Sequence, residues 1–205
     1  MMQREQGLVQ RGGKVYALFM LALVSVWGGQ AWAYSAWQDA YVNRLRNISV
    51  NYQVDGAICE QVARLELEAE YPRQQYKVDV NLAYGLGNQV LGELDVVVSE
   101  KFSDAVILVG EVKCWTEPGR AQAKGAAQRL RFMDHIQRTQ GLWVRQDHRY
   151  FKMSRFSDLR DFVLIGPRGS RRHGFERELR LGLEDLMDLR RTMMDCQKAG
   201  ECAAP

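Results

Sequence analysis

The chain has 205 residues, of which 46% are hydrophobic and 26% charged, with 28 Lys and Arg against 25 Asp and Glu. This composition excludes a disordered or low-complexity chain, and the length suits one domain with a substantial core. The near balance of charge also excludes binding of nucleic acid by bulk positive charge, so any such contact must come from local clusters.

Residues 1–33 have the pattern of a secretory signal peptide. A basic segment precedes an apolar run over residues 15–26, and residues 31–33 (AWA) supply small side chains at the cleavage positions. The run is shorter than the roughly 20 residues of a membrane span. We therefore expect cleavage between Ala33 and Tyr34 and a periplasmic or secreted single domain over residues 34–205. The alternative is an uncleaved signal that anchors the protein in the membrane.

All four cysteines, Cys59, Cys114, Cys196 and Cys202, follow the predicted signal. An even number in an exported chain predicts disulfides, and three pairings are possible. A local Cys196–Cys202 loop around a short polar tail is our first expectation, with Cys59–Cys114 as the second bridge. Zinc is the alternative, but the spacing has no paired C-x-x-C knuckles.

Helical patterns dominate residues 36–70. The segment over residues 57–70 (AICEQVARLELEAE) predicts an amphipathic helix, ended by Tyr71-Pro72. Its expected inward stripe consists of Ile58, Val62, Leu65 and Ala69.

Strand patterns follow. Residues 76–84 alternate in polarity, residues 85–88 (GLGN) predict a turn, and residues 90–98 return as the hairpin partner. The apolar run over residues 105–111 (AVILVGE) predicts a strand buried on both faces. A late buried strand is expected over residues 162–166.

Two further helices complete the predicted α/β order. After a break at Pro118-Gly119, residues 121–139 predict a helix. A C-terminal amphipathic helix is expected over about residues 175–195. Its expected inward side chains are Leu179, Leu183, Leu186 and Leu189.

Acidic and basic side chains gather where two predicted strands meet. Glu93 and Asp95 point to one side of their strand, and Glu111 and Lys113 share a face of the next. Two carboxylates and an ammonium at the end of a buried sheet are costly unless they bind something. A divalent cation beside a phosphodiester would fit. The plainer alternatives are a buried ion pair or a solvated strand end, because Glu-x-Lys alone is a common tripeptide.

The order of helix, strand with G-E-L-D-V-V-V, strand ending in E-V-K and helix with a central Gln resembles the PD-(D/E)XK nuclease superfamily, over roughly residues 55–166. Within it, the nuclease-related-domain, resolvase-like and RecB-like branch is nearest. The resemblance implies a restriction-endonuclease-like α/β/α core with a central mixed sheet flanked by helices. Asp95 and Glu111 match the metal-binding acids, and Lys113 matches the catalytic lysine. Two departures are Leu94 in place of a proline, and Phe132 in place of a tyrosine.

The same resemblance implies further site residues. Glu60 matches a first-helix glutamate that serves as an additional metal ligand, and Gln128 matches a helical glutamine of the RecB-like members. Mg²⁺ or Mn²⁺ would be held by Asp95, Glu111, Glu60 and the carbonyl of Val112, since hard oxygen ligands suit these ions.

The expected function is therefore an exported, metal-dependent nuclease. DNA is the expected partner rather than RNA, endonucleolytic cutting is favoured, and a homodimer is conceivable. The alternative is a nuclease-fold protein without activity that binds or assembles in the envelope or in a DNA-transfer system. Trp115, two positions after Lys113, could stack on a base, although a core or rim aromatic is the plainer interpretation. Arg129 could contact phosphates or simply be solvated.

Overall fold

The computed structural model describes residues 37–139 and 141–205. The predicted signal peptide over residues 1–33 lies outside this part of the chain. The chain divides into two units, Met1–Ala40 and Tyr41–Pro205, and all the elements named below belong to the second. No helix in the described residues is both long and apolar enough to span a membrane.

A seven-stranded mixed sheet forms the centre of this unit, in the order β5-β4-β1-β2-β3-β6-β7. Neighbouring strands pair antiparallel except β3 with β6 and β6 with β7, which are parallel. The expected α/β class is therefore confirmed. The strands are β1 (Tyr76–Leu86), β2 (Gln89–Glu100), β3 (Val106–Val112), β4 (Leu142–Gln146), β5 (Arg149–Phe151), β6 (Asp161–Gly166) and β7 (Arg177–Glu178).

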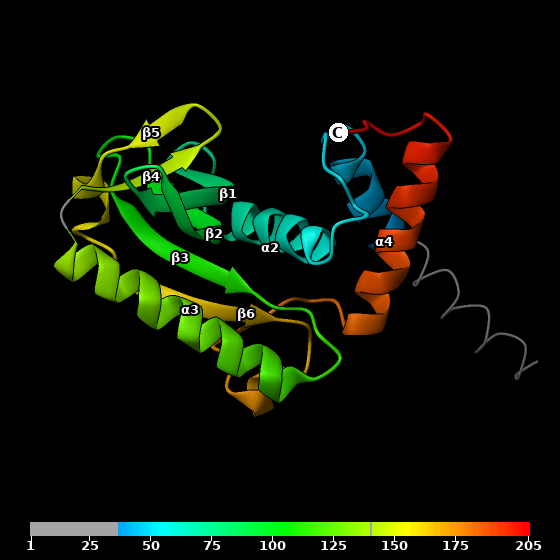
Figure 1. The fold of residues 1–205 in the computed structure, drawn as a ribbon. Helices are drawn as coiled ribbons and strands as arrows, with labels where there is room; N and C mark the ends of the chain where they lie inside the picture. Colours follow the sequence, from blue (N-terminus) through cyan, green and yellow to red (C-terminus); the bar gives the residue numbers. More distant parts are fainter. Residues whose placement is uncertain (1–36, 140) are drawn as a thin grey trace, which may run out of the picture. The chain divides into compact units, whose positions relative to one another are not determined.

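Helices cover both sides of the centre of the sheet. The helix α2 (Ala57–Glu70) contacts β1, β2 and β3, whereas α3 (Pro118–Arg138) contacts β3 and β6. Figure 1 shows α2 and α3 on opposite sides of β3. The third helix, α4 (Leu183–Lys198), contacts α2. Two short 3-10 helices, η1 (Met153–Phe156) and η2 (Arg171–His173), lie in the connections.

An aromatic core lies between α3 and the sheet. Phe132 of α3 is fully buried and packs edge-on against Tyr84, with ring centroids 4.9 Å apart, and against Phe156 and Phe162 at 5.8 Å. Such edge-to-face pairs add to the burial of apolar surface. The Phe132 ring therefore belongs to the hydrophobic core. A tyrosine at this position would need a buried hydrogen-bond partner for its hydroxyl.

The helix α2 coincides with the predicted helix over residues 57–70, but two details differ. Residues 46–56 form turns and irregular structure, so the helical region before α2 is confined to residues 37–45. Ala69, expected in the inward stripe, is exposed, whereas Gln61 is buried.

Two predicted boundaries were wrong. Pro118 and Gly119 form the first turn of α3 rather than a break, because proline suits a position whose N–H has no helical partner. The C-terminal helix begins at Leu183 and not near residue 175, since residues 177–178 pair with β6 as β7. Leu179 is buried, but from the segment between β7 and α4.

Two disulfides hold the unit together. Cys59 is bonded to Cys114, 55 residues away, and Cys196 is bonded to Cys202. Both expected pairings are confirmed. Such bonds persist in oxidising compartments, so they fit a protein that works outside the cytoplasm.

Candidate active site at the end of the β2–β3 ladder

The strands β2 and β3 stop pairing at the point where the predicted acids stand. Val96 opposite Gly110 is the last pair of their ladder in this direction, and Asp95 and Glu111 follow directly on the two strands. Asp95 Oδ2 accepts a hydrogen bond from the Val112 N–H at 2.7 Å. The Asp95 carboxylate thus accepts a hydrogen bond that a backbone carbonyl would accept in a continuing ladder. This bond fixes the side chain against β3.

The Lys113 ammonium lies where three oxygens converge. Its Nζ is 3.3 Å from Asp95 Oδ2 and 3.1 Å from the Val112 carbonyl, and it donates to Glu111 Oε1. The backbone N–H of Lys113 donates to the Ile165 carbonyl at 2.9 Å, which ties this residue to β6. The structure therefore brings Asp95, Glu111 and Lys113 into one cluster, together with the Val112 carbonyl.

The cluster is buried, and its charges do not balance. Asp95, Glu111 and Lys113 are 7%, 1% and 9% exposed. Burial raises the pKa of Asp95, and burial together with the Asp95 charge raises that of Glu111 to about 7. Burial alone would lower the pKa of Lys113, but the two carboxylates outweigh it and raise this pKa, so the ammonium stays protonated. Two carboxylates thus share one cation, and Glu111 Oε2 is buried without a hydrogen-bond partner among the described residues.

Glu60 approaches the same place from the first turn of α2. Burial and then the Asp95 charge raise its pKa to about 8. Gly56, with φ of +92°, makes room for it, since a Cβ there would lie 3.2 Å from Glu60 Oε1. The disulfide joins the two residues that adjoin Glu60 and Lys113, namely Cys59 and Cys114. This bond fixes α2 against the end of β3.

Glu60 does not complete a metal site as the side chains stand. Among residues 37–139 and 141–205, no three His, Cys, Asp or Glu side chains are close enough together to hold a metal ion. The closely gathered carboxylates are those of Asp95 and Glu111, and their charges add to the effect of burial in raising the pKa of Glu60. Glu93 is classed as exposed by its solvent-accessible surface. The protein around its carboxyl still reduces solvation, and this effect, followed by the Asp95 charge, raises the pKa of Glu93.

Gln128 lies on the face of α3 that passes over Glu111. One turn earlier, Gly125 lets the helix come close, since a Cβ there would be 3.0 Å from Leu164 Cδ2 and 3.6 Å from Glu111 Cγ. The Gln128 side chain is half-buried, and its Oε1 has no hydrogen-bond partner in the described part of the chain. This predicted residue is therefore near the cluster without a bond to it.

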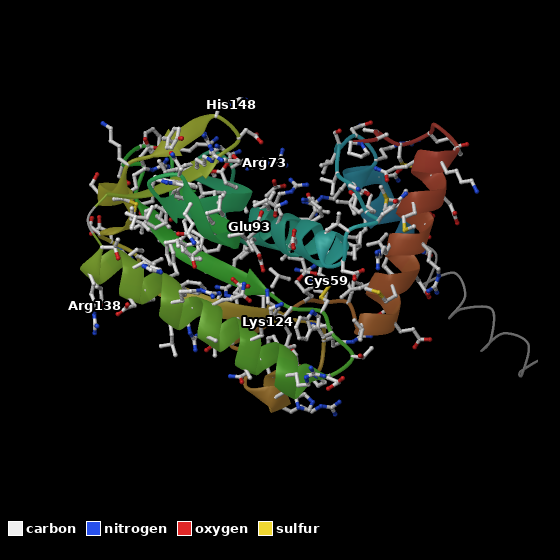
Figure 2. All side chains as sticks on the ribbon, viewed as in Figure 1. Cys59, Arg73, Glu93, Lys124, Arg138 and His148 are labelled. Atoms are coloured by element: carbon white, nitrogen blue, oxygen red, sulfur yellow. A yellow bond between two sulfur atoms is a disulfide. The ribbon has the colours of Figure 1, made fainter. Side chains whose placement is uncertain are left out.

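A cavity of about 530 Å³ opens beside the cluster. It is lined by Asp55, Gly56, Glu60, Val112, Lys113, Cys114, Trp115, Thr116, Glu117, Lys124, Met187 and Arg190. Figure 2 shows Cys59 on α2 and Lys124 on α3, both near the end of β3. The cavity thus reaches Lys113 and Val112 between the starts of α2 and α3.

Sequence reasoning missed Lys124 and the contacts that Arg129 makes within the fold. Lys124 stands over the Trp115 ring, with Nζ 4.7 Å from the centroid, and no motif in the sequence marks it. Arg129 donates to the Phe162 carbonyl at 3.1 Å and pairs with Glu176 at 2.7 Å. Its guanidinium therefore joins α3 to the β6 region.

Comparisons of the chain with protein-family models, curated proteins and solved structures found no match. The candidate site is therefore interpreted from its own chemistry.

Proposed function

We propose that this protein is an exported, metal-dependent nuclease with a restriction-endonuclease-like core, and that it hydrolyses phosphodiester bonds, preferably in DNA. The observation that carries this proposal is the buried cluster of Asp95, Glu111 and Lys113 beside an open cavity. Burying two carboxylates and an ammonium costs folding free energy, and a function that needs them together explains why they are there.

The donor set fits a hard divalent cation. Oxygens of Asp95, Glu111 and Val112 already surround one positive charge, that of Lys113. The partnerless Oε2 of Glu111 is a further oxygen available as a ligand, and Glu60 lines the cavity beside Lys113. Oxygen ligands of this kind suit Mg²⁺ or Mn²⁺. The ammonium and a metal ion would share these oxygens, and the cavity gives Lys113 room to turn toward a substrate.

Each side chain has a chemical task in such a reaction. When bound, the metal ion would lower the pKa of a coordinated water and offset negative charge on the phosphate. Lys113, kept protonated by its carboxylate neighbours, would stabilise the charge that develops on the phosphate oxygens. Asp95 and Glu111 hold Lys113 in place through their hydrogen bonds. Gln128 has a free carbonyl oxygen with which it could orient the attacking water.

A second candidate function is binding or assembly on an inactive nuclease fold. It is favoured by the contacts that Lys113 makes with both carboxylates in the described residues, where no three-ligand metal group is present. The nearly balanced charge of the chain points the same way. A homodimer is compatible with either function.

The test is cleavage by the full chain, expressed and purified under oxidising conditions. Plasmid DNA, single-stranded DNA and RNA are incubated with Mg²⁺, Mn²⁺ or EDTA. Asp95→Asn and Lys113→Ala variants are measured alongside Lys101→Ala, which changes an exposed lysine away from the cluster. We expect metal-dependent cutting that falls at least a hundredfold in the first two variants and is unchanged in the third.

Two results would count against the proposal. Cutting that survives in EDTA would contradict a metal-dependent reaction. A well-folded wild type that cuts none of the three substrates would favour the binding function.

A further inference from the structure

The segment between β3 and α3 places an aromatic ring and a free cation beside the buried cluster. Trp115 follows Lys113 by two residues and is 40% exposed, which is unusual for the largest apolar side chain. Both residues line the same cavity. The ring therefore forms part of the wall of the cavity that Lys113 also lines.

The backbone at Trp115 is held on both sides. Cys114, directly before it, is bonded to Cys59 of α2, and Pro118 starts α3 three residues after it. The chain between these two points is short, so the backbone that carries the indole has little freedom to lose when a ligand binds. A pre-positioned aromatic surface of this kind binds at low entropic cost.

Lys124 supplies the matching charge. Its ammonium lies 4.7 Å from the centre of the Trp115 ring, and it forms no ion pair with a described carboxylate. The other two cations in the wall are already paired: Arg190 is bonded to the Tyr52 carbonyl and to Asp55, and Lys113 to Asp95 and Glu111. Lys124 is thus the cavity cation that a phosphate could engage without breaking an existing ion pair among the described residues.

We propose that this cavity binds one unpaired nucleotide of a single-stranded nucleic acid, with its base stacked on Trp115 and its phosphate on Lys124. The inference rests on the proposed function and names its substrate class. A volume of about 530 Å³ lies within the range of about 300–1,000 Å³ found for ligand pockets. A base within a duplex is stacked on its neighbours, so its face reaches a side chain only when the strand is single or the base is flipped out.

The experiment separates binding from cutting. The full chain is titrated in EDTA against fluorescein-labelled (dT)12 and against a 12-base-pair duplex, and binding is followed by fluorescence anisotropy. Trp115→Ala, Trp115→Phe and Lys124→Ala are compared with Tyr150→Ala, which removes an aromatic ring 62% exposed on β5. Circular dichroism and melting curves establish that each variant is folded.

We expect Trp115→Ala to weaken (dT)12 binding at least about fivefold, the lower end of base-stacking effects. Trp115→Phe should retain most of the affinity, Lys124→Ala should weaken binding and reduce its salt dependence, and Tyr150→Ala should leave it unchanged. Duplex binding should change less than twofold in all four variants. Equal losses for single strand and duplex, or no loss in Trp115→Ala, would overturn the inference.

The two proposals can fail separately. If the protein cuts duplex DNA and substitution of Trp115 does not change the rate, the proposed nuclease function is supported and the single-strand site is rejected. Binding of (dT)12 through Trp115 by a wild type that never cuts would keep the site and reject the nuclease.

Discussion

At Glu111, one carboxylate oxygen contacts the Lys113 ammonium and the other is buried without a partner among the described residues. Asp95 depends on the same ammonium and on the Val112 N–H. The cation therefore holds together a cluster that would otherwise be an uncompensated pair of buried acids. Its removal should affect folding as well as any reaction.

The Lys113→Ala variant should lose stability in EDTA and regain it with Mg²⁺ or Mn²⁺. Breaking a buried pair by removing one partner costs about 3–5 kcal/mol, and a divalent ion would replace the missing charge. Urea denaturation at pH 7 measures both effects, with Lys101→Ala as the control expected to stay within about 0.5 kcal/mol of wild type. A variant as stable as wild type in EDTA, or one indifferent to metal, would contradict this account.

At this scale the sequence identified the cluster but not its surroundings. The alternation of side chains on two strands was sufficient to predict that Asp95, Glu111 and Lys113 lie together. The partner of Arg129 could not be predicted, because Glu176 belongs to a segment 47 residues later in the chain. Lys124 was missed for the same reason, since its relation to Trp115 depends on how α3 lies against the end of β3.

At the scale of elements, Glu176 joins α3 to the sheet. Its carboxylate accepts hydrogen bonds from Arg129 of α3 and from the Leu164 N–H of β6, each at 2.7 Å. Burial opposes ionisation, but these hydrogen bonds outweigh it and hold the pKa of Glu176 below its ordinary value. The ionised form therefore stabilises the position of α3 over Glu111.

The stability that Glu176 contributes should depend on pH. It is fully present above the ordinary glutamate pKa of about 4.3 and is lost as the pH falls through the lower folded-state pKa. We expect Glu176→Gln to cost about 1 kcal/mol or less at pH 7, because the side chain is 43% exposed, and the difference from wild type should shrink toward pH 3.

Melting curves between pH 3 and 8 measure this effect. Glu117→Gln, which removes an ion pair with Arg120 in which both side chains are well exposed, should have a smaller effect at pH 7. A difference between Glu176→Gln and wild type that grows as the pH falls would show that the carboxylate does not act in this way.

Elements with strong periodicity could be predicted, and those without it could not. The helix α2 matched the predicted residues, since its apolar spacing and its Tyr71-Pro72 ending agree. The hairpin of β4 and β5 was not predicted, because its two short strands expose arginines and tyrosine and turn at Asp147, whose φ is +51°. The strand β7 has two residues and exists only through its pairing with β6.

At the scale of the whole molecule, the two disulfides constrain the unfolded chain to different extents. The Cys59–Cys114 bond closes a loop of 55 residues, and the Cys196–Cys202 bond closes one of six. Chain entropy predicts about 4 kcal/mol for the first bond and about 2 kcal/mol for the second. The first bond also connects α2 to the end of β3, where the cluster lies.

Removing the bonds separately should therefore have unequal effects. A Cys59→Ser/Cys114→Ser variant should lose roughly twice the stability of a Cys196→Ser/Cys202→Ser variant in urea denaturation. On the proposed function it should also lose most of its activity under conditions where both variants remain folded. Equal activity in the two folded variants would show that the site does not depend on the Cys59–Cys114 bond.

The Cys59–Cys114 bond has a consequence for the cell that makes this protein. A chain still in the reducing cytoplasm would carry two thiols in place of the bond, so Glu60 and Lys113 would lack the covalent link between their elements. On the proposed function, the nuclease would therefore mature only after it had left the compartment that holds the producer's chromosome. Oxidation of the two thiols after export would then complete the site and protect the producer's own DNA until that step.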